Sequence, residues 1–256
     1  MKCVDTACFY GRWPFRAWGD TDVSDMLEKA SGNNVNSLMI SSVQSIFYQD
    51  SFEGEMELHS ALAGYKNVYH IATVNPMMPG WEADLEKEVR EYGIRAVKVF
   101  PGYHKYSLFA PEMERLCQVL EGYDLPLILC LRVEDERVAY MVLQQTVPID
   151  AVGLFMCSHR NLKLVLSNIS FGEVMSSKPN IISRDKIWID TAGFKFISFP
   201  LEKLLVHFSE DQFLFGSQFP LYIQKGIMNE VTEDDLPEET KEKILWSNAA
   251  KLFRLD

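Results

Sequence analysis

Arg95-Ala96-Val97-Lys98-Val99-Phe100 begins with an arginine and continues as a short apolar run that a single lysine interrupts. Near-continuous runs of this kind are typical of strands in a parallel sheet that is covered on both faces. A lysine directed into a covering layer of helices would leave its ammonium group in an apolar surrounding. We therefore expect Lys98 to face the other side of its strand, away from the helices.

Runs of the same kind recur along the chain and alternate with segments of helical periodicity. The eight predicted strands are Lys2–Phe9, Ser37–Val43, Val68–Val74, Arg95–Phe100, Pro126–Leu131, Leu162–Leu166, Ile187–Thr191 and Gln212–Gly216. Apolar residues spaced as one buried helical stripe lie between them, in the sets Val23, Met26, Leu27, Ala30; Met113, Leu116, Cys117, Leu120; and Leu201, Leu204, Leu205, Phe208.

Eight βα units in 256 residues predict a (β/α)8 TIM barrel, regular or distorted, formed by residues 1–256 as a single domain. An open doubly wound sheet ranks second. Its first turn normally carries a glycine-rich dinucleotide motif, which Tyr10-Gly11-Arg12-Trp13-Pro14 lacks. In a barrel, function lies at the carboxyl ends of the strands, so we look for site residues there.

Composition excludes several classes of partner. A net charge of −11 without a local basic cluster argues against nucleic acid, and no apolar stretch is long enough to predict a membrane span. The five cysteines are odd in number and lack paired spacings, which is typical of a reducing compartment. We expect a cytoplasmic protein, and homo-oligomerisation stays open.

Four segments also carry a family pattern: Val4-Asp5-Thr6-Ala7-Cys8-Phe9-Tyr10-Gly11, Arg95–Pro101, Phe213-Leu214-Phe215-Gly216-Ser217-Gln218-Phe219-Pro220, and Ser247-Asn248-Ala249-Ala250-Lys251-Leu252-Phe253. In this order they resemble the first-strand D-x-H-x-H-x-G signature, the fourth-strand segment, the eighth-strand L-F-G-S-D-F-P element and the closing N-A-x-x-L-F helix of one branch of the amidohydrolase superfamily. That branch is the amidohydrolase-related, decarboxylase-like one. The last two segments are the more specific signals.

The resemblance implies a metal held by histidines from strands one, five and six and by an aspartate from strand eight. The corresponding residues here are Ala7, Phe9, Cys130, Asn168 and Gln218. A catalytic divalent ion needs about three or four imidazole, thiolate or carboxylate donors, which this set does not supply. We therefore predict no metal and no other cofactor.

Polar residues near the predicted strand ends are the candidate site. Lys98, His104 and Arg132 are the candidate catalytic residues. The candidate substrate-binding residues are Arg12, Tyr10, Asn75, Asn168, Asp190 and Gln218. A cationic rim of Lys98, Arg12 and Arg132 would suit a small anionic ligand. The alternatives are an internal ion pair of Lys98 with Asp5 or Asp190, and ordinary salt bridges for the two arginines.

Three functional hypotheses follow. The first is a metal-independent hydrolase or lyase acting on a small carboxylate-bearing substrate, such as a lactone or amide, with Lys98, His104 and Arg132 in the reaction. The second is a catalytically inactive barrel that binds a small anionic metabolite. The third, ranked last, is an atypical metal site built from Cys130, His104 or Asp190.

Overall fold

The computed structural model describes the chain except for residues 16, 19–21, 135–144, 178–184 and 196. Its strands form one parallel eight-stranded sheet in sequence order. They are β1 (Val4–Tyr10), β2 (Ser37–Ser42), β3 (Val68–Thr73), β4 (Ala96–Val99), β5 (Leu127–Cys130), β6 (Leu164–Ser167), β7 (Ile187–Asp190) and β8 (Phe213–Leu214). Each lies within two residues of its predicted ends.

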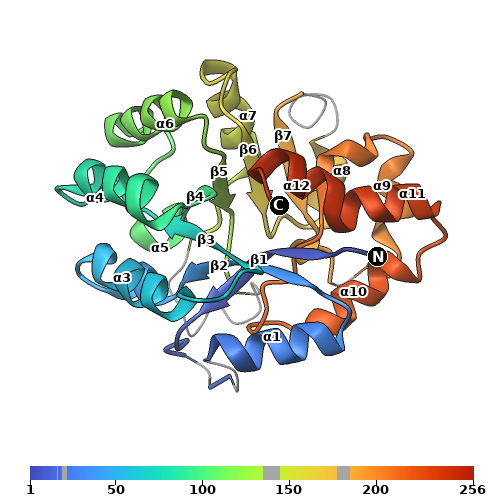
Figure 1. Cartoon of the computed structure of the whole chain (residues 1–256). Coiled ribbons are helices and arrows are strands. Elements are labelled where there is room, and N and C mark those ends of the chain that lie inside the picture. Colours follow the sequence, from blue (N-terminus) through green and yellow to red (C-terminus); the bar gives the residue numbers. More distant parts are fainter. Residues whose placement is uncertain (16, 19–21, 135–144, 178–184, 196) are drawn as a thin grey trace.

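Backbone hydrogen bonds bring the two edges of this sheet together. The amide of Thr6 donates to the carbonyl of Phe215 at 2.9 Å, and the amide of Phe9 donates to the carbonyl of Phe219 at 2.8 Å. Helices surround the strands (Figure 1). The prediction of a (β/α)8 barrel is confirmed, and the open sheet is excluded by this closure.

The α-helices are α1 (Val23–Gly32), α2 (Gln44–Phe47), α3 (Ser51–Leu62), α4 (Trp81–Lys87), α5 (Pro101–His104), α6 (Pro111–Tyr123), α7 (Ile149–Ser158), α8 (Phe171–Ser176), α9 (Pro200–Leu205), α10 (Gln224–Thr232), α11 (Glu238–Glu242) and α12 (Asn248–Phe253). Short 3-10 turns are η3 (Thr191–Gly193) and η4 (Glu210–Gln212), and π-helical turns are η1 (Glu88–Tyr92) and η5 (Lys243–Ser247). The predicted stripe is buried on α6, and on α1 and α9 it is buried except for the half-buried Leu27 and Leu205. The helix α9 ends before Phe208.

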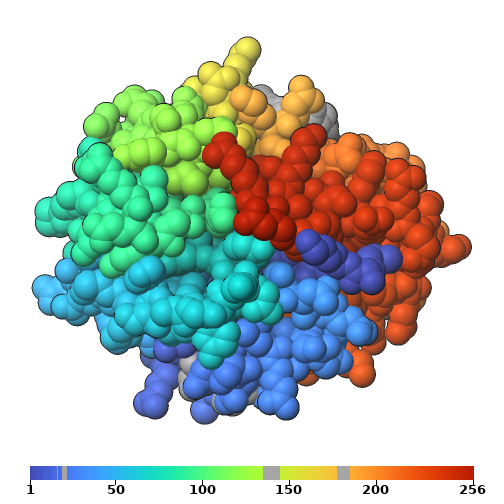
Figure 2. Space-filling view, in the orientation of Figure 1, coloured from blue at the N-terminus to red at the C-terminus, as the bar shows by residue number. Residues whose placement is uncertain are grey.

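The amino-terminal end of the barrel is closed by the last helix. Ala249, Leu252 and Phe253 of α12 pack against the lowest layer of lumenal side chains, which includes Val4 and Ala96. Figure 2 shows this face covered, with the red C-terminal helix in its middle and the blue N-terminus beside it. The opposite, carboxyl end of the strands is therefore the mouth of the barrel.

Side chains two residues apart on a strand point to the same face. On β4 this places Ala96 in the apolar lowest layer, Lys98 in the middle and Phe100 at the mouth. Middle-layer positions on other strands hold Thr73, Cys130 and Asp190, all buried. The lumen thus changes from an apolar floor to a polar middle layer. No helix among the described residues has both the length and the apolar character needed to cross a membrane.

Candidate active site

Lys98 is the centre of the polar middle layer. Its side chain is 0% exposed, and its ammonium lies 4.3 Å from the ring centroid of Phe9 and 5.5 Å from that of Phe100. Lysine beside aromatic faces gains a cation–π attraction of about 0.5–2 kcal/mol. Within the described part of the chain, the Nζ atom has no hydrogen-bond partner. Lys98 therefore faces the lumen, as its position between two valines predicted.

Two further polar groups lack a protein partner in this part of the barrel. Gln218 follows β8, is 0% exposed and has a φ of 57°, a left-handed conformation that is uncommon for glutamine. Neither its amide oxygen nor its amide nitrogen has a partner among the described residues, and the same holds for the hydroxyl of Thr73. Because buried polar groups are normally hydrogen-bonded, the described part of the protein does not by itself satisfy this region.

Asp190 ends β7 on the same lumenal layer. One carboxylate oxygen accepts hydrogen bonds from the backbone amides of Asn168 at 3.0 Å and Ala192 at 3.2 Å. Burial raises the pKa of Asp190, while those amides and the charge of Lys98 oppose the rise. Lys98 and Asp190 attract each other, but they form no salt bridge within 4.0 Å. The carboxylate of Asp5 accepts hydrogen bonds from Ser217 and Gln224 and forms no salt bridge with Lys98 among the described residues. The predicted internal ion pair is not found.

The buried cysteines of β1 and β5 are protonated at neutral pH. Burial raises the pKa of Cys130 to about 11, although Lys98 partly opposes this, and the thiol donates to the carbonyl of Arg132 at 3.1 Å. Burial and the nearby Asp5 raise the pKa of Cys8 well above its usual value. Since the thiolate is the nucleophile, both thiols match the structural role that buried strand cysteines usually have.

Arg132 is engaged in a buried ion pair. Its Nη1 atom donates to Glu173 at 2.8 Å and to the carbonyl of Asn168 at 2.9 Å, and Nη2 donates to the second oxygen of Glu173. Burial opposes ionisation of Glu173, but Arg132 and Ser170 hold the pKa of this carboxyl below its usual value. Arg12 is exposed. Glu173 therefore neutralises Arg132, whereas Lys98 and Arg12 stay candidate members of the predicted cationic rim.

The amide of Asn168 ties three segments together. Its Nδ2 atom donates to the carbonyls of Arg132 at 2.8 Å and Val133 at 3.2 Å, and its Oδ1 atom accepts from Lys195 at 3.2 Å. With a φ of 58°, Asn168 turns the chain directly after β6. These bonds give Asn168 a role in holding the mouth together, beside its predicted role in binding.

Three other predicted residues lie at the mouth. Tyr10 is half-buried at the end of β1, and the Oδ1 atom of Asn75 accepts from the amide of Met77 at 3.1 Å in the turn after β3. His104 ends α5, where its Nε2 atom lies 3.1 Å from the carbonyl of Ile46. Burial lowers the pKa of His104, so the ring is neutral at pH 7 and Nε2 carries the proton donated to this carbonyl. Its buried Nδ1 has no partner among the described residues and is an acceptor.

An aromatic cluster that the sequence analysis did not identify covers the same end of the barrel. The ring of Trp13 meets Phe47 at 5.4 Å and Tyr103 at 6.0 Å between centroids, both edge to face. The indole nitrogen of Trp13 donates to Glu134 at 2.7 Å. All of these residues follow predicted strands, and that placement was the available signal.

The five positions that the resemblance assigns to metal ligands do not form a metal site here. Ala7 and Phe9 have no donor atom, and Cys130 holds its proton. Asn168 and Gln218 offer only neutral amides, and the amide of Asn168 is already bonded to the protein. This set does not fit a divalent ion.

The atypical site of Cys130, His104 and Asp190 does not assemble either. Across the ranges that the structure describes, no three His, Cys, Asp or Glu side chains come together so that they could hold a metal ion.

Comparisons with known proteins agree with this architecture. No curated protein matches the chain. Among solved structures, 5-carboxyvanillate decarboxylase from Sphingomonas paucimobilis has a TM-score of 0.77 at 13% identity, covering 100% of this chain and 99% of that one. 2,6-Dihydroxybenzoate decarboxylase from Rhizobium has a TM-score of 0.75 at 16% identity, with coverage of 100% and 99%.

A dihydroxybenzoic acid decarboxylase from a Polaromonas species, solved with manganese and the inhibitor 2-nitroresorcinol, has a TM-score of 0.76 at 14% identity and coverage of 99% and 97%. At these identities the solved structures share the fold. The family model described as Amidohydrolase matches residues 62–255, which is most of the barrel. The chain therefore belongs to the amidohydrolase family.

Proposed function

We propose that the barrel binds a small aromatic carboxylate in its lumen without a metal ion, and that Lys98 holds the carboxylate. The observation that carries this proposal is the buried ammonium of Lys98, which has no hydrogen-bond partner among the described residues. An unpaired charge away from water is costly, and a ligand carboxylate supplies the missing partner. The amide of Gln218 offers a hydrogen-bond donor and an acceptor in the same end of the barrel.

The aromatic character of the ligand is inferred from the walls. Phe9 and Phe100 flank Lys98, and Trp13 and Tyr103 lie at the mouth in the cluster described above. Aromatic rings pack well against one another in offset and edge-to-face arrangements. The three structural neighbours are named for aromatic acids, which supports this ligand class for a barrel of the same fold.

Turnover of such a ligand, by hydrolysis of a lactone or amide, is the second candidate function. The neutral ring of His104 has an acceptor at Nδ1, as a general base requires. Burial raises the pKa of Asp190, which lies in the same lumenal layer as Lys98. Arg132 contacts Asn168 and Glu173, so we assign it a positioning role.

Binding is tested by calorimetry on protein dialysed against a chelator. Benzoate, 2,6-dihydroxybenzoate and 5-carboxyvanillate are compared with their neutral methyl esters. We expect the acids to bind, the esters to bind at least tenfold more weakly, and Lys98→Met to remove this preference. Lys225→Met changes an exposed lysine on α10 and serves as the matched control. Equal affinity of Lys98→Met for the acids would contradict the proposal, as would binding that requires a stoichiometric metal.

Turnover is tested separately by screening lactones and carboxylated cyclic amides with the same chelator-treated protein. Hydrolysis that falls at least a hundredfold in His104→Gln while carboxylate binding persists would support catalysis. Binding without hydrolysis across the screen would favour the inactive barrel.

A further inference from the structure

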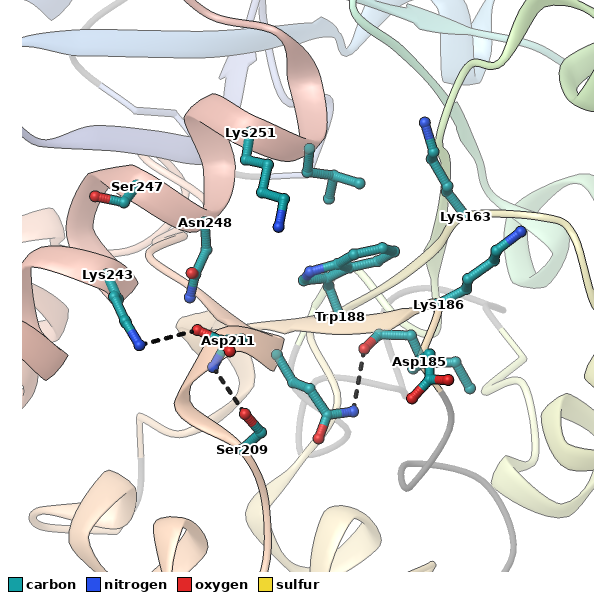
Figure 3. Close-up of a pocket in the computed structure, with 13 residues that line it drawn as sticks. Lys163, Asp185, Lys186, Trp188, Ser209, Asp211, Lys243, Ser247, Asn248 and Lys251 are labelled. Atoms are coloured by element: carbon teal, nitrogen blue, oxygen red, sulfur yellow. Dashed lines mark hydrogen bonds and ion pairs between the residues drawn. The ribbon is translucent and has the colours of Figure 1, made fainter.

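A cavity of about 800 Å³ lies at the amino-terminal end of the barrel, opposite the mouth. Lys163, Lys186 and Gln212 line it from the starts of β6, β7 and β8. The other wall comes from η5 and α12, which contribute Lys243 and Lys251 (Figure 3). None of these residues belongs to the site at the mouth, so the cavity needs its own explanation.

The lining is locally basic in an acidic protein. It contains four lysines and two aspartates, whereas the chain carries a net charge of −11. Lys163 pairs with Asp124 at 2.7 Å, and Lys243 pairs with Glu210 at 2.5 Å and with Asp211 at 3.2 Å. Lys186 donates to a backbone carbonyl at 3.1 Å. Among the described residues, Lys186 and Lys251 have no carboxylate within salt-bridge distance, so two ammonium groups remain for an anion.

Trp188 gives the cavity an aromatic surface. The residue is half-buried and packs partly against the lowest lumenal layer. In Figure 3, Lys251 extends from α12 toward the indole, while Lys163 and Lys186 lie on its other side in the view. An indole ring offers a stacking surface for a flat ring, and ammonium groups that line the same cavity attract negative charge elsewhere on the same ligand.

The backbone beside the cavity is also unusual. Lys243 and Ser247, both in the lining, begin and end the π-helical turn η5. Such turns are rare and occur frequently at functional sites, because the extra residue shifts the direction of the side chains around it. Here the turn lies directly before α12, the helix that carries Lys251.

We propose that this cavity binds a nucleoside phosphate, with the base against Trp188 and the phosphates on Lys186 and Lys251. Lysine binds phosphate as a point charge on a flexible stem. Lysines are the cations in the lining that the structure describes. Several separated ammonium groups match a chain of phosphates better than one carboxylate.

Calorimetric titration with AMP, ADP and ATP at low salt tests this proposal, with adenosine and inorganic phosphate as the two halves of the ligand. We expect affinity to rise with the number of phosphates and to fall with added salt, and each half to bind at least tenfold more weakly than ADP. Quenching of tryptophan fluorescence by ADP is expected from Trp188 and is lost in Trp188→Phe. Since the lysine variants change flexible cavity-lining side chains, they are expected to fold.

Lys186→Met and Lys251→Met are each expected to weaken ADP at least tenfold, while Lys225→Met leaves it unchanged. Lys98→Met is also expected to bind ADP normally, which separates this site from the one at the mouth. Absence of ADP binding at millimolar concentration would overturn the proposal. So would equal affinity for ADP and inorganic phosphate, or equal weakening by the Lys225 control.

Discussion

Replacing both buried charges of the lumen, in Lys98→Met with Asp190→Asn, is expected to make the protein more stable. Methionine keeps the length and apolar stem of the lysine, and the asparagine oxygen can still accept from the amides of Asn168 and Ala192. The charges themselves are then gone. We infer that the two charges are present to bind a ligand and not to stabilise the fold.

The size of the expected gain in stability follows from opposing contributions to the free energy of unfolding. Removing each ion from water costs several kcal/mol. Against this stand the cation–π contacts of Lys98 with Phe9 and Phe100, of order 0.5–2 kcal/mol, and the attraction to Asp190. Because the two charges are not within salt-bridge distance, that attraction stays below about 4 kcal/mol at an effective dielectric constant of about 20. Replacement of buried ion pairs by neutral groups is typically neutral or stabilising by about 1–4 kcal/mol, the gain we expect here.

Urea denaturation at pH 4, 6 and 8 measures the free energy of unfolding of the wild type, both single variants and the double variant. The raised pKa of Asp190 means that the folded protein holds a proton which the unfolded chain releases. The contribution of this group to stability is therefore present below the unfolded pKa of about 3.9 and is lost as the pH rises toward the folded pKa. The advantage of the double variant should be larger at pH 8 than at pH 4.

The two single variants complete a double-mutant cycle with the wild type and the double variant. Lys98→Met alone leaves Asp190 without its cation, so we expect it to be less stable than the double variant. A double variant that is less stable than the wild type at pH 8 would refute the reasoning. It would show that the two charges hold the barrel together instead of serving a ligand.

Three other predictions concern groups outside the lumenal centre. Glu88 is 2% exposed, and one of its carboxylate oxygens has no partner among the described residues. Burial together with nearby Glu55 raises its pKa, so Glu88→Gln should stabilise the fold by about 1–3 kcal/mol at pH 7 and by less at pH 4. Denaturation at both pH values measures this difference. Arg132→Met leaves the half-buried carboxylate of Glu173 without its cation, so thermal denaturation should show a loss of about 3–5 kcal/mol in the free energy of unfolding. Adding Glu173→Gln should recover much of this loss, and no recovery would contradict the ion-pair assignment. Cys157 is the exposed thiol of the five, so a thiol reagent should modify one cysteine per folded chain at pH 7.5, and rapid modification of more would show that the buried thiols are accessible.

The local pattern of the sequence was sufficient for the elements and for the direction of Lys98. Each strand is an apolar run that both the lumen and the helices bury, and each main helix shows a stripe at helical spacing. The polarity of a single residue between Val97 and Val99 was enough to place its side chain in the lumen. These properties depend on neighbours within a few residues, which sequence alone displays.

Pairings between strand ends were not predictable in this way. Arg132 meets Glu173 over 41 residues, and Asp5 accepts from Ser217 over 212 residues. Nothing in the sequence near Arg132 indicates that Glu173, held by a capping box at the start of α8, will neutralise it. This pairing neutralises one member of the predicted cationic rim.

By itself, the sequence determined that eight buried strands alternate with helices and that a lysine lies inside them. Only the tertiary structure decided which charges in the barrel find partners, how the aromatic rings gather at the mouth, and that four lysines and Trp188 line one cavity at the far end. The physical reason is that burial follows from local hydrophobic periodicity, whereas charge neutralisation and cavity shape depend on residues that closure of the barrel brings together from distant parts of the chain.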